Sequence, residues 1–358
     1  MRHAMPVTAL AALLIASAAL AKPPAPQPKS PTPPASASSA VAPDAARISP
    51  ADRKRMQAIQ QYQHDLVSVV ALRADPDYLL GAAILAKPFQ NPTQGLDFDA
   101  LSQRAAAAPN AGAPVEWARL DACKSEKDCP NAQAFAWLKQ HAADNAAVWI
   151  VAMDVAARDK SDKAERAALK QAAAAKTYDD YYGKALAGVA KAVAVLPPLP
   201  DTTQGAHDGQ PDNADGVRML VAVMNIQNHI RPAFGPLEQL CGDDAAKDDD
   251  LKSDCLKLAH TLQWGSSPIA RAVGLHIQGT LNPDEKSRSD QASQNLAWQV
   301  HQYSALLQRG LTDTAQASQW LTTARNGGTE LSLMLATLRA NQVPLDAPAP
   351  TGAASTGR

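Results

Sequence analysis

The 358-residue chain is poor in aromatic residues, which make up 4% of it, and its formal net charge is only −1. A near-neutral chain gives no electrostatic reason to expect nucleic acid or an anionic membrane surface as a partner. Its β-branched residues are scattered at helical spacings and do not alternate, which argues against a sheet. Hydrophobic residues nevertheless reach 46%, so the chain has the apolar content of a protein with a sizeable core.

The motifs that mark common enzyme and metal-binding families are also missing. The chain contains no HExxH, GxSxG, P-loop, GxGxxG or EF-hand pattern. Its eight histidines are scattered, and a site built from them would require tertiary convergence that the sequence does not indicate. The aspartates between Asp243 and Asp254 lack the alternating ligands of a calcium loop, which favours a solvated turn. We therefore predict no catalytic residue, metal or cofactor. The sequence leaves open whether the protein is an enzyme and favours one that is not.

The N-terminal residues 1–21 have the pattern of a secretory signal peptide. Arg2 supplies a positive charge, an uncharged run rich in Ala, Leu and Ile follows, and Ala19 and Ala21 form a small-x-small motif. Cleavage after Ala21 predicts a periplasmic or secreted protein with no stable membrane insertion. The alternative is an uncleaved anchor helix, although residues 4–21 are slightly short for the roughly 20 apolar residues that span a bilayer.

Proline-rich stretches divide the rest of the chain. Residues 22–48 are rich in Pro, Ala and Ser and cannot build a core, so we expect a disordered linker there. A helical region should follow over 49–195, then a second linker over 196–213, a second helical region over 214–342 and a disordered tail over 343–358. The sequence does not show whether the two helical regions form one continuous array.

Helix signals recur throughout both regions and predict an all-α fold, with helical hairpins stacked as an irregular α-solenoid or helical array. Alanine, the best helix former, is abundant, and apolar residues recur at spacings of three and four. Ser49 followed by Pro50 predicts the first helix start, because serine caps helices well and proline suits their first turn. By the same reasoning Pro130 should start a helix, Asp144 should cap the next, and Thr177 should cap the last helix of the first region.

Residues 144–175 show the pattern of two antiparallel helices in close contact. A large aromatic side chain stands early in the first helix and small side chains follow in both helices: Trp149, then Ala152 and Ala156, then Ala164 and Ala168. This pattern resembles one unit of the tetratricopeptide repeat family. It departs from that family in lacking the usual Gly and Tyr of the first helix and the closing proline. The resemblance implies helical hairpins with a concave face that binds a partner.

The four cysteines are an even number in a chain predicted to be exported, which indicates disulfides. Three pairings are open, and we predict the local one, Cys123 with Cys129 and Cys241 with Cys255, because each pair brackets one turn between helices. On the chain-entropy model the 241–255 bridge adds ~3 kcal/mol and the shorter loop roughly 2 kcal/mol. Neither spacing is that of a CxxC redox pair, and neither pair has another Cys or His at zinc-ligand spacing.

The most distinctive polar cluster lies between residues 177 and 182, where three tyrosines and two acids follow one another. Tyrosines recur in recognition surfaces, so this segment is the candidate partner surface. The alternative is a capped helix start whose tyrosines pack on a neighbouring helix. The candidate residues are Tyr178, Asp179, Asp180, Tyr181 and Tyr182.

Two functional hypotheses follow from the export signal and the helical hairpins. The first is an exported, non-catalytic helical-repeat protein that binds another protein or an envelope component. The second is an envelope-acting hydrolase or lyase whose acids and histidines meet in a cleft between the helical halves. The sequence identifies neither the partner nor the oligomeric state.

Overall fold

A computed structural model of the chain describes residues 49–122, 129–199 and 213–348. The chain divides into two units, Met1–Lys54 and Arg55–Arg358. In the described part of the first unit, the backbone N–H of Asp52 donates to Oγ of Ser49 at 3.0 Å, and the first helix begins at Pro50. This confirms the predicted helix start. The signal peptide and the linker over 22–48 lie outside the described residues and stay predictions.

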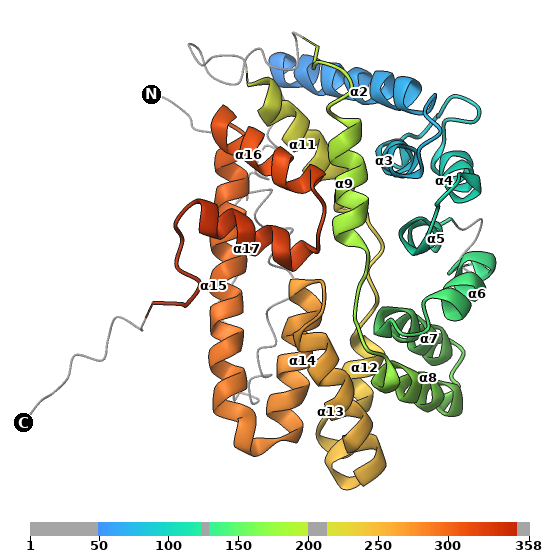
Figure 1. The fold of residues 1–358 in the computed structure, drawn as a ribbon, viewed down its shortest axis with the longest axis vertical. Coiled ribbons are helices and arrows are strands. Elements are labelled where there is room, and N and C mark those ends of the chain that lie inside the picture. The colour runs from blue at the N-terminus through green and yellow to red at the C-terminus, as the bar shows by residue number, and fades with distance from the viewer. Residues whose placement is uncertain (1–48, 123–128, 200–212, 349–358) are drawn as a thin grey trace, which may run out of the picture. The chain divides into compact units, whose positions relative to one another are not determined.

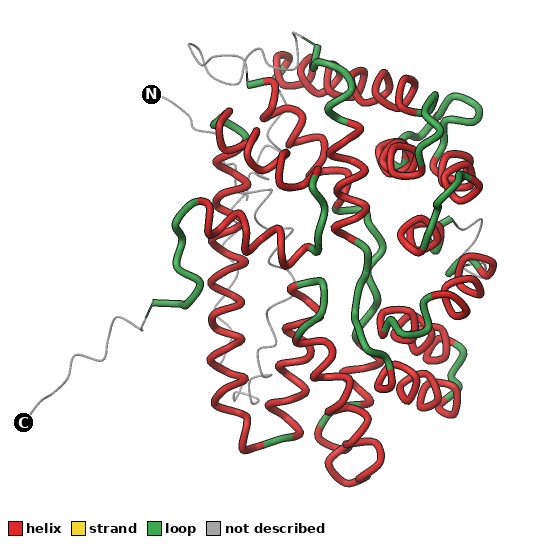
Figure 2. Tube along the Cα trace, in the orientation of Figure 1, coloured by secondary structure: helices red, strands yellow, loops and turns green. Residues whose placement is uncertain are grey.

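The described residues form fifteen α-helices and two short 3₁₀ helices, and their only β-type pairing is a single bridge (Figure 1, Figure 2). The all-α fold predicted from the sequence is confirmed. The elements are α2 (Pro50–Val70), α3 (Pro76–Ala86), α4 (Phe98–Ala107), α5 (Ala113–Arg119), α6 (Ala132–His141), α7 (Ala146–Arg158), α8 (Asp162–Ala174), α9 (Tyr182–Ala192), α11 (Ala214–Ile226), α12 (Gly235–Leu240), η2 (Asp243–Lys247), α13 (Asp249–Gln263), α14 (Pro268–Leu281), η3 (Pro283–Glu285), α15 (Lys286–Gly310), α16 (Thr314–Arg325) and α17 (Glu330–Ala340).

Some consecutive helices pack as hairpins, but the largest contacts also join helices far apart in the sequence. Helices α7 and α8 pack together, as do α13 with α14 and α14 with α15. In addition, α3 packs against α9, α8 against α13, and α11 against α16. A solenoid confines contacts to neighbouring repeats. The second unit is therefore an irregular helical array rather than a one-dimensional stack.

Two main cores hold the array together, and each draws helices from both predicted helical regions. One core contains Leu66, Leu80 and Val189 together with Val221 and Trp320. The other contains Trp117 and Ile150 of the first region together with Leu237, Leu258 and Leu262 of the second. Residues on both sides of the predicted 196–213 linker therefore share cores. The region boundaries are accordingly not boundaries between cores.

Glycine permits the closest approach between α3 and α9. A Cβ atom built on Gly81 would stand 2.3 Å from the carbonyl oxygen of Gly188, and one on Gly188 would stand 2.6 Å from the carbonyl oxygen of Asp77. Because no real side chain tolerates such distances, the two backbones touch directly at this crossing. The small residues of both helices make this packing possible.

Three local predictions need correction. Pro130 does not start α6, because Asn131 caps that helix and α6 begins at Ala132. Asp144 does not cap α7, because the side chain of Asn145 accepts from Ala147 N instead. Ala164, predicted to lie at a helix contact, is exposed on α8. The α7–α8 hairpin itself is present, whereas membership of the tetratricopeptide family stays a prediction.

The predicted disordered tail is ordered in its first residues. Trp298 Nε1 donates to the carbonyl oxygen of Pro344 at 2.9 Å, and Gln299 Nε2 donates to that of Leu345 at 2.8 Å. Val343 and Leu345 also pack against a third, smaller cluster between α15 and α17. Residues 343–348 thus lie along α15, and 349–358 lie outside the described residues. Among the helices that are described, none has the length and apolar run needed to cross a bilayer.

Candidate functional site

The tyrosine-rich segment before α9 is not a helix start. Helix α9 begins at Tyr182, after Tyr181, whose φ of +54° is in the left-handed region. Thr177 therefore does not cap it, and its carbonyl oxygen instead accepts from Ala146 N at 2.8 Å. The segment is pinned to the start of α7 as an extended chain, because a distant element supplies its hydrogen bonds.

One side chain, that of Asn145, performs most of this pinning. Its Oδ1 accepts from Ala147 N at 3.1 Å, which caps α7, and also from Asp179 N at 2.9 Å. Its Nδ2 donates to the carbonyl oxygen of Asp179 at 2.7 Å. An aspartate at position 145 could not make the last bond, because a carboxylate has no N–H to donate. The amide thus serves as a cap and a clamp at once.

Asp180 is fully buried at the centre of the segment. Its Oδ1 accepts from Ser266 Oγ at 3.1 Å and from Tyr182 N at 3.3 Å. Its backbone carbonyl oxygen lies 2.7 Å from His229 Nε2. Its Oδ2 has no hydrogen-bond partner among the described residues, and neither has the buried hydroxyl of Tyr178. Buried unpaired polar atoms are rare in proteins, so these two atoms mark the segment as unusual.

His229 is buried against the segment that precedes α9. Burial lowers the pKa of its imidazole, while the bond to the Asp180 carbonyl and the Asp180 carboxylate act in the opposite direction without cancelling it. Because the partner of Nε2 is a carbonyl oxygen, Nε2 carries the proton and donates. The ring also meets that of Tyr182 edge-on, with 5.9 Å between centroids. His229 therefore links the loop after α11 to the segment before α9.

An ion pair adds the start of α17 to the same region. Arg231 donates to both carboxylate oxygens of Glu330, at 2.9 and 2.8 Å, and its guanidinium lies 4.8 Å from the centroid of the Tyr182 ring. Burial raises the pKa of Glu330, and Arg231 partly offsets that effect. We call these residues the buried polar junction, since they join four separate segments: Tyr178, Asp180, Tyr182, His229, Arg231, Ser266 and Glu330.

The predicted partner surface lies mostly inside this junction. Tyr178 and Asp180 are buried, while Asp179, Tyr181 and Tyr182 are half-buried. Burial also raises the pKa of Tyr178 and of Tyr182 well above the usual range, so both stay protonated at neutral pH. In this conformation Tyr178 and Asp180 do not face solvent. Partner contact by the other three stays a prediction.

The exposed residue next to the junction is Trp264, which the sequence marks only as the end of a helix. Its side chain is 79% exposed at the C-terminal end of α13. The chain after it is held tightly, because Ser266 N donates to the carbonyl oxygen of Tyr178 at 3.0 Å. A Cβ at Gly265 would stand 2.9 Å from the Tyr178 ring, so this position accepts only glycine without rearrangement. The buried polar junction thus fixes the backbone next to an exposed tryptophan.

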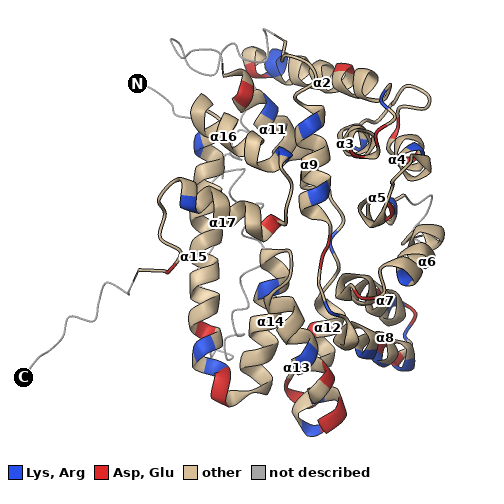
Figure 3. Ribbon diagram, viewed as in Figure 1, with Lys and Arg blue, Asp and Glu red and all other residues tan. Residues whose placement is uncertain are grey.

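A groove of about 760 Å³ lies along the same helix. Its lining is Asp249, Lys252, Ser253, Leu256, Lys257, His260 and Gln278, of which only the last comes from α14. Trp264 follows His260 by four residues, which is about one helical turn, so it stands at the C-terminal end of this row. Figure 3 shows that α13 carries both acidic and basic side chains. We call the groove and Trp264 together the α13 surface.

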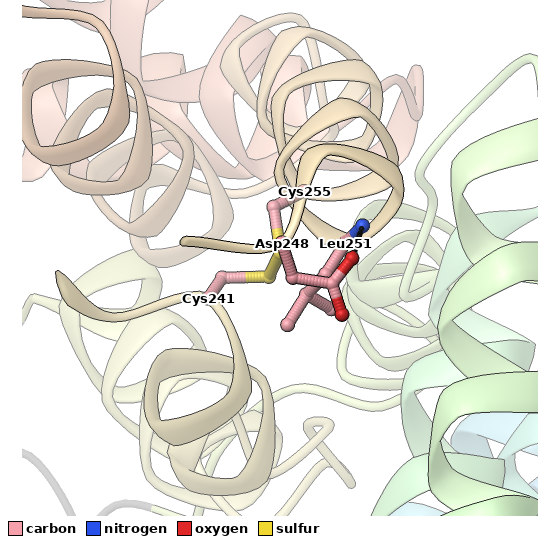
Figure 4. The surroundings of a disulfide bond; sticks show 4 residues. All are labelled: Cys241, Asp248, Leu251 and Cys255. Carbon is pink, nitrogen blue, oxygen red and sulfur yellow. Dashed lines mark hydrogen bonds between the residues drawn. A yellow bond between two sulfur atoms is a disulfide. The ribbon is translucent and has the colours of Figure 1, made fainter. Parts of the chain in front are cut away.

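A disulfide fixes the N-terminal end of the α13 surface. Cys241 and Cys255 are bonded, with Cα atoms 5.6 Å apart, so the end of α12 is tied to the second turn of α13 (Figure 4). Beside it, Asp248 caps α13 by accepting from Leu251 N at 3.0 Å and pairs with Arg166 of α8 at 2.9 Å. The predicted 241–255 pairing is confirmed. The 123–129 pairing stays a prediction, because Cys123 lies outside the described residues.

No group of His, Cys, Asp and Glu side chains suited to a metal ion occurs within the described part of the chain. Comparisons of the chain with protein-family models, with curated proteins and with solved structures yield no match. The candidate site is accordingly defined by geometry alone. It consists of the α13 surface and of the junction that supports it.

Proposed function

We propose that the protein is exported and binds a protein or another component of the cell envelope without carrying out chemistry, and that the α13 surface is where it binds. The observation that carries the proposal is the exposure of Trp264. A tryptophan buries more apolar area in an interface than any other side chain, and it is enriched among the residues that dominate binding energy. Exposing this ring to water is unfavourable, and a partner that covers it would remove that cost.

The surroundings of Trp264 suit a binding role. The buried polar junction holds the chain at Ser266, and the disulfide holds the other end of α13. A surface held at both ends loses little conformational entropy on binding, which leaves more of the contact energy for affinity. The predicted export signal and the disulfide indicate the same compartment, because disulfides form and persist in the periplasm or outside the cell.

The test is site-specific photo-crosslinking in living cells. A benzoylphenylalanine in place of Trp264 in the full-length protein should give a discrete, ultraviolet-dependent adduct. The matched control carries the same group in place of Gln319, an exposed residue on α16. Adducts of equal yield at both positions, or at neither, would contradict a specific surface around Trp264.

Export is tested separately on the same cells. Cell fractionation should place the protein in the periplasm or the medium, and mass spectrometry should find Lys22 as the first residue. An intact Met1 in a cytoplasmic fraction would contradict this part of the proposal.

A further inference from the structure

The α13 surface has a charge pattern that restricts what binds there. At the Trp264 end stand His260 and Arg271, and neither forms an ion pair with a carboxylate of the described residues. At the other end, in the first turn of α13, Asp249 and Lys252 stand one turn apart and both line the groove. The surface therefore presents a cation, Arg271, near its exposed aromatic ring and charges of both signs at the start of α13.

Arg271 belongs to this surface by its position on α14. Helix α14 meets α13 at Gly274, where a Cβ would stand 2.6 Å from the carbonyl oxygen of Ala259. Arg271 lies three residues before Gly274 and Gln278 lies four after it, so all three share one side of α14. Gln278 lines the groove. Arg271 therefore stands on the same side, in the turn nearest the connection from Trp264.

The guanidinium of Arg271 lacks a counter-ion. The residue is half-buried, and burial lowers the pKa of its side chain with no carboxylate of the described residues to offset that effect. A partly desolvated cation of this kind gains from an incoming anion, because a charge-assisted hydrogen bond is about twice as strong as a neutral one. Arginine also binds a carboxylate with two parallel bonds.

The rest of the groove is mostly polar and offers apolar contact at two points, which suits an amphipathic segment. Leu256 is the apolar residue of its lining and Trp264 stands at its end, while Asp249, Ser253, Lys257 and His260 are exposed. A site this open does not enclose a small molecule, which usually has most of its surface buried in its pocket. It matches an amphipathic segment laid into a groove between helices. A soluble anion alone would leave Leu256 and the Trp264 ring in water.

Resting on the proposed function, we infer that the α13 surface binds an amphipathic peptide segment of a protein partner. That segment places a carboxylate against Arg271 and apolar side chains against Leu256 and Trp264. The partner is thus a protein with an acidic and apolar stretch, rather than a glycan or a lipid.

The first arm of the test uses the photo-crosslinker at Trp264 in the full-length protein. Mass spectrometry of the adduct should identify a peptide with Asp or Glu beside apolar residues. Adding Arg271→Gln should reduce adduct yield about tenfold, the effect expected for one lost charge-assisted pair. The matched control Arg288→Gln removes an arginine that is 84% exposed on α15 and should leave the yield unchanged.

The second arm measures binding of a synthetic probe to the purified protein. The probe is a labelled 14-residue helical peptide with Leu on one face and Glu beside it, compared with the same peptide carrying Gln in place of Glu. Anisotropy should show the Glu peptide binding about tenfold more tightly, with the difference lost in Arg271→Gln. Dextran sulfate and phosphatidylglycerol vesicles serve as the glycan and lipid probes.

The outcomes separate the two claims. An adduct that is a glycan, a lipid or a basic peptide, or a yield unaffected by Arg271→Gln, overturns the inference and leaves the proposed function standing. Equal binding of the Glu and Gln peptides, binding of neither, or Arg271-dependent binding of only dextran sulfate or vesicles overturns it as well. Absence of any adduct at Trp264 overturns both. Circular dichroism and the melting temperature confirm that each variant is folded.

Discussion

The imidazole Nε2 of His229 lies 2.7 Å from the backbone carbonyl oxygen of Asp180, a residue 49 positions earlier in the chain. This bond joins the loop after α11 to the extended segment before α9. The bond and the nearby Asp180 carboxylate both favour a charged ring, but burial outweighs them and lowers the pKa of His229. The neutral ring is therefore the form that the fold selects.

A pH dependence of stability follows from His229. Its pKa in the folded protein is below the ordinary value of about 6.5, so below that pH the unfolded chain binds more protons and stability falls with acidification. His229→Gln keeps an N–H for the Asp180 carbonyl but does not titrate. Urea denaturation at pH 7.5 and 5.5 should show a smaller loss of stability in this variant than in the wild type.

The control for this prediction is His301→Gln, which removes an exposed histidine of α15. It should retain the wild-type loss between the two pH values. Glu330 acts in the opposite direction, because its raised pKa makes the folded state bind more protons as pH falls toward its unfolded value. Since Glu330 is unchanged in both variants, the comparison isolates His229. Equal losses in wild type and His229→Gln would contradict the assignment.

The Arg231–Glu330 pair should matter for stability far more than pairs on the surface. Glu330→Gln leaves the guanidinium partly buried without its carboxylate. Losing one partner of a fully buried pair costs several kcal/mol, and Arg231 is 32% exposed, so we expect about 2 kcal/mol. Glu285→Gln breaks the exposed pair with Arg288 and should cost no more than about 0.5 kcal/mol. Chemical denaturation measures both, and similar costs would contradict the structural role of the junction.

The sequence predicted the fold class because local signals and packing agree over most of the chain. Ser49 and Pro50 form a helix start that needs no distant partner, and the structure retains it. At Asp144 and Asn145 two good capping residues are adjacent, and local rules cannot choose between them. The choice is tertiary, because the Asp144 carbonyl oxygen accepts from Thr177 N at 3.1 Å while the Asn145 amide clamps the same distant segment.

Local sequence rules predict even less of the candidate site. The sequence singled out the tyrosines of residues 177–182, but the groups that surround them come from positions 229, 231, 266 and 330, which no local pattern connects. Trp264 escaped attention for a related reason. It lies two residues after Leu262, at the end of a helix whose buried side includes Leu258 and Leu262, and its exposure depends on how the chain turns after the helix.

The Cys241–Cys255 disulfide should contribute measurably to stability. Replacing both cysteines with serine releases a loop of 14 residues and should lower the free energy of unfolding by about 3 kcal/mol. Denaturation of the double variant against wild type under non-reducing conditions tests this. Mass spectrometry of the unreduced, digested wild type should find the 241–255 peptide pair, and the pairing predicted for Cys123 with Cys129 is read in the same experiment. Alkylated thiols at all four positions would contradict both the disulfides and the export argument.

Truncation of two tryptophans should have different effects, a loss of stability for one and a loss of binding for the other. Trp117 is fully buried and its Nε1 donates to the carbonyl oxygen of Ile230 at 3.1 Å, so Trp117→Ala leaves a cavity and should cost about 3–5 kcal/mol. Trp264 has few contacts to lose, and Trp264→Ala should change stability by no more than about 0.5 kcal/mol. If the α13 surface binds a partner, Trp264→Ala should nevertheless abolish co-purification of the partner identified by crosslinking. Measuring stability and binding together distinguishes a binding residue from a core residue. A large loss of stability in Trp264→Ala would show that the Trp264 ring packs against the protein and would contradict its role in binding.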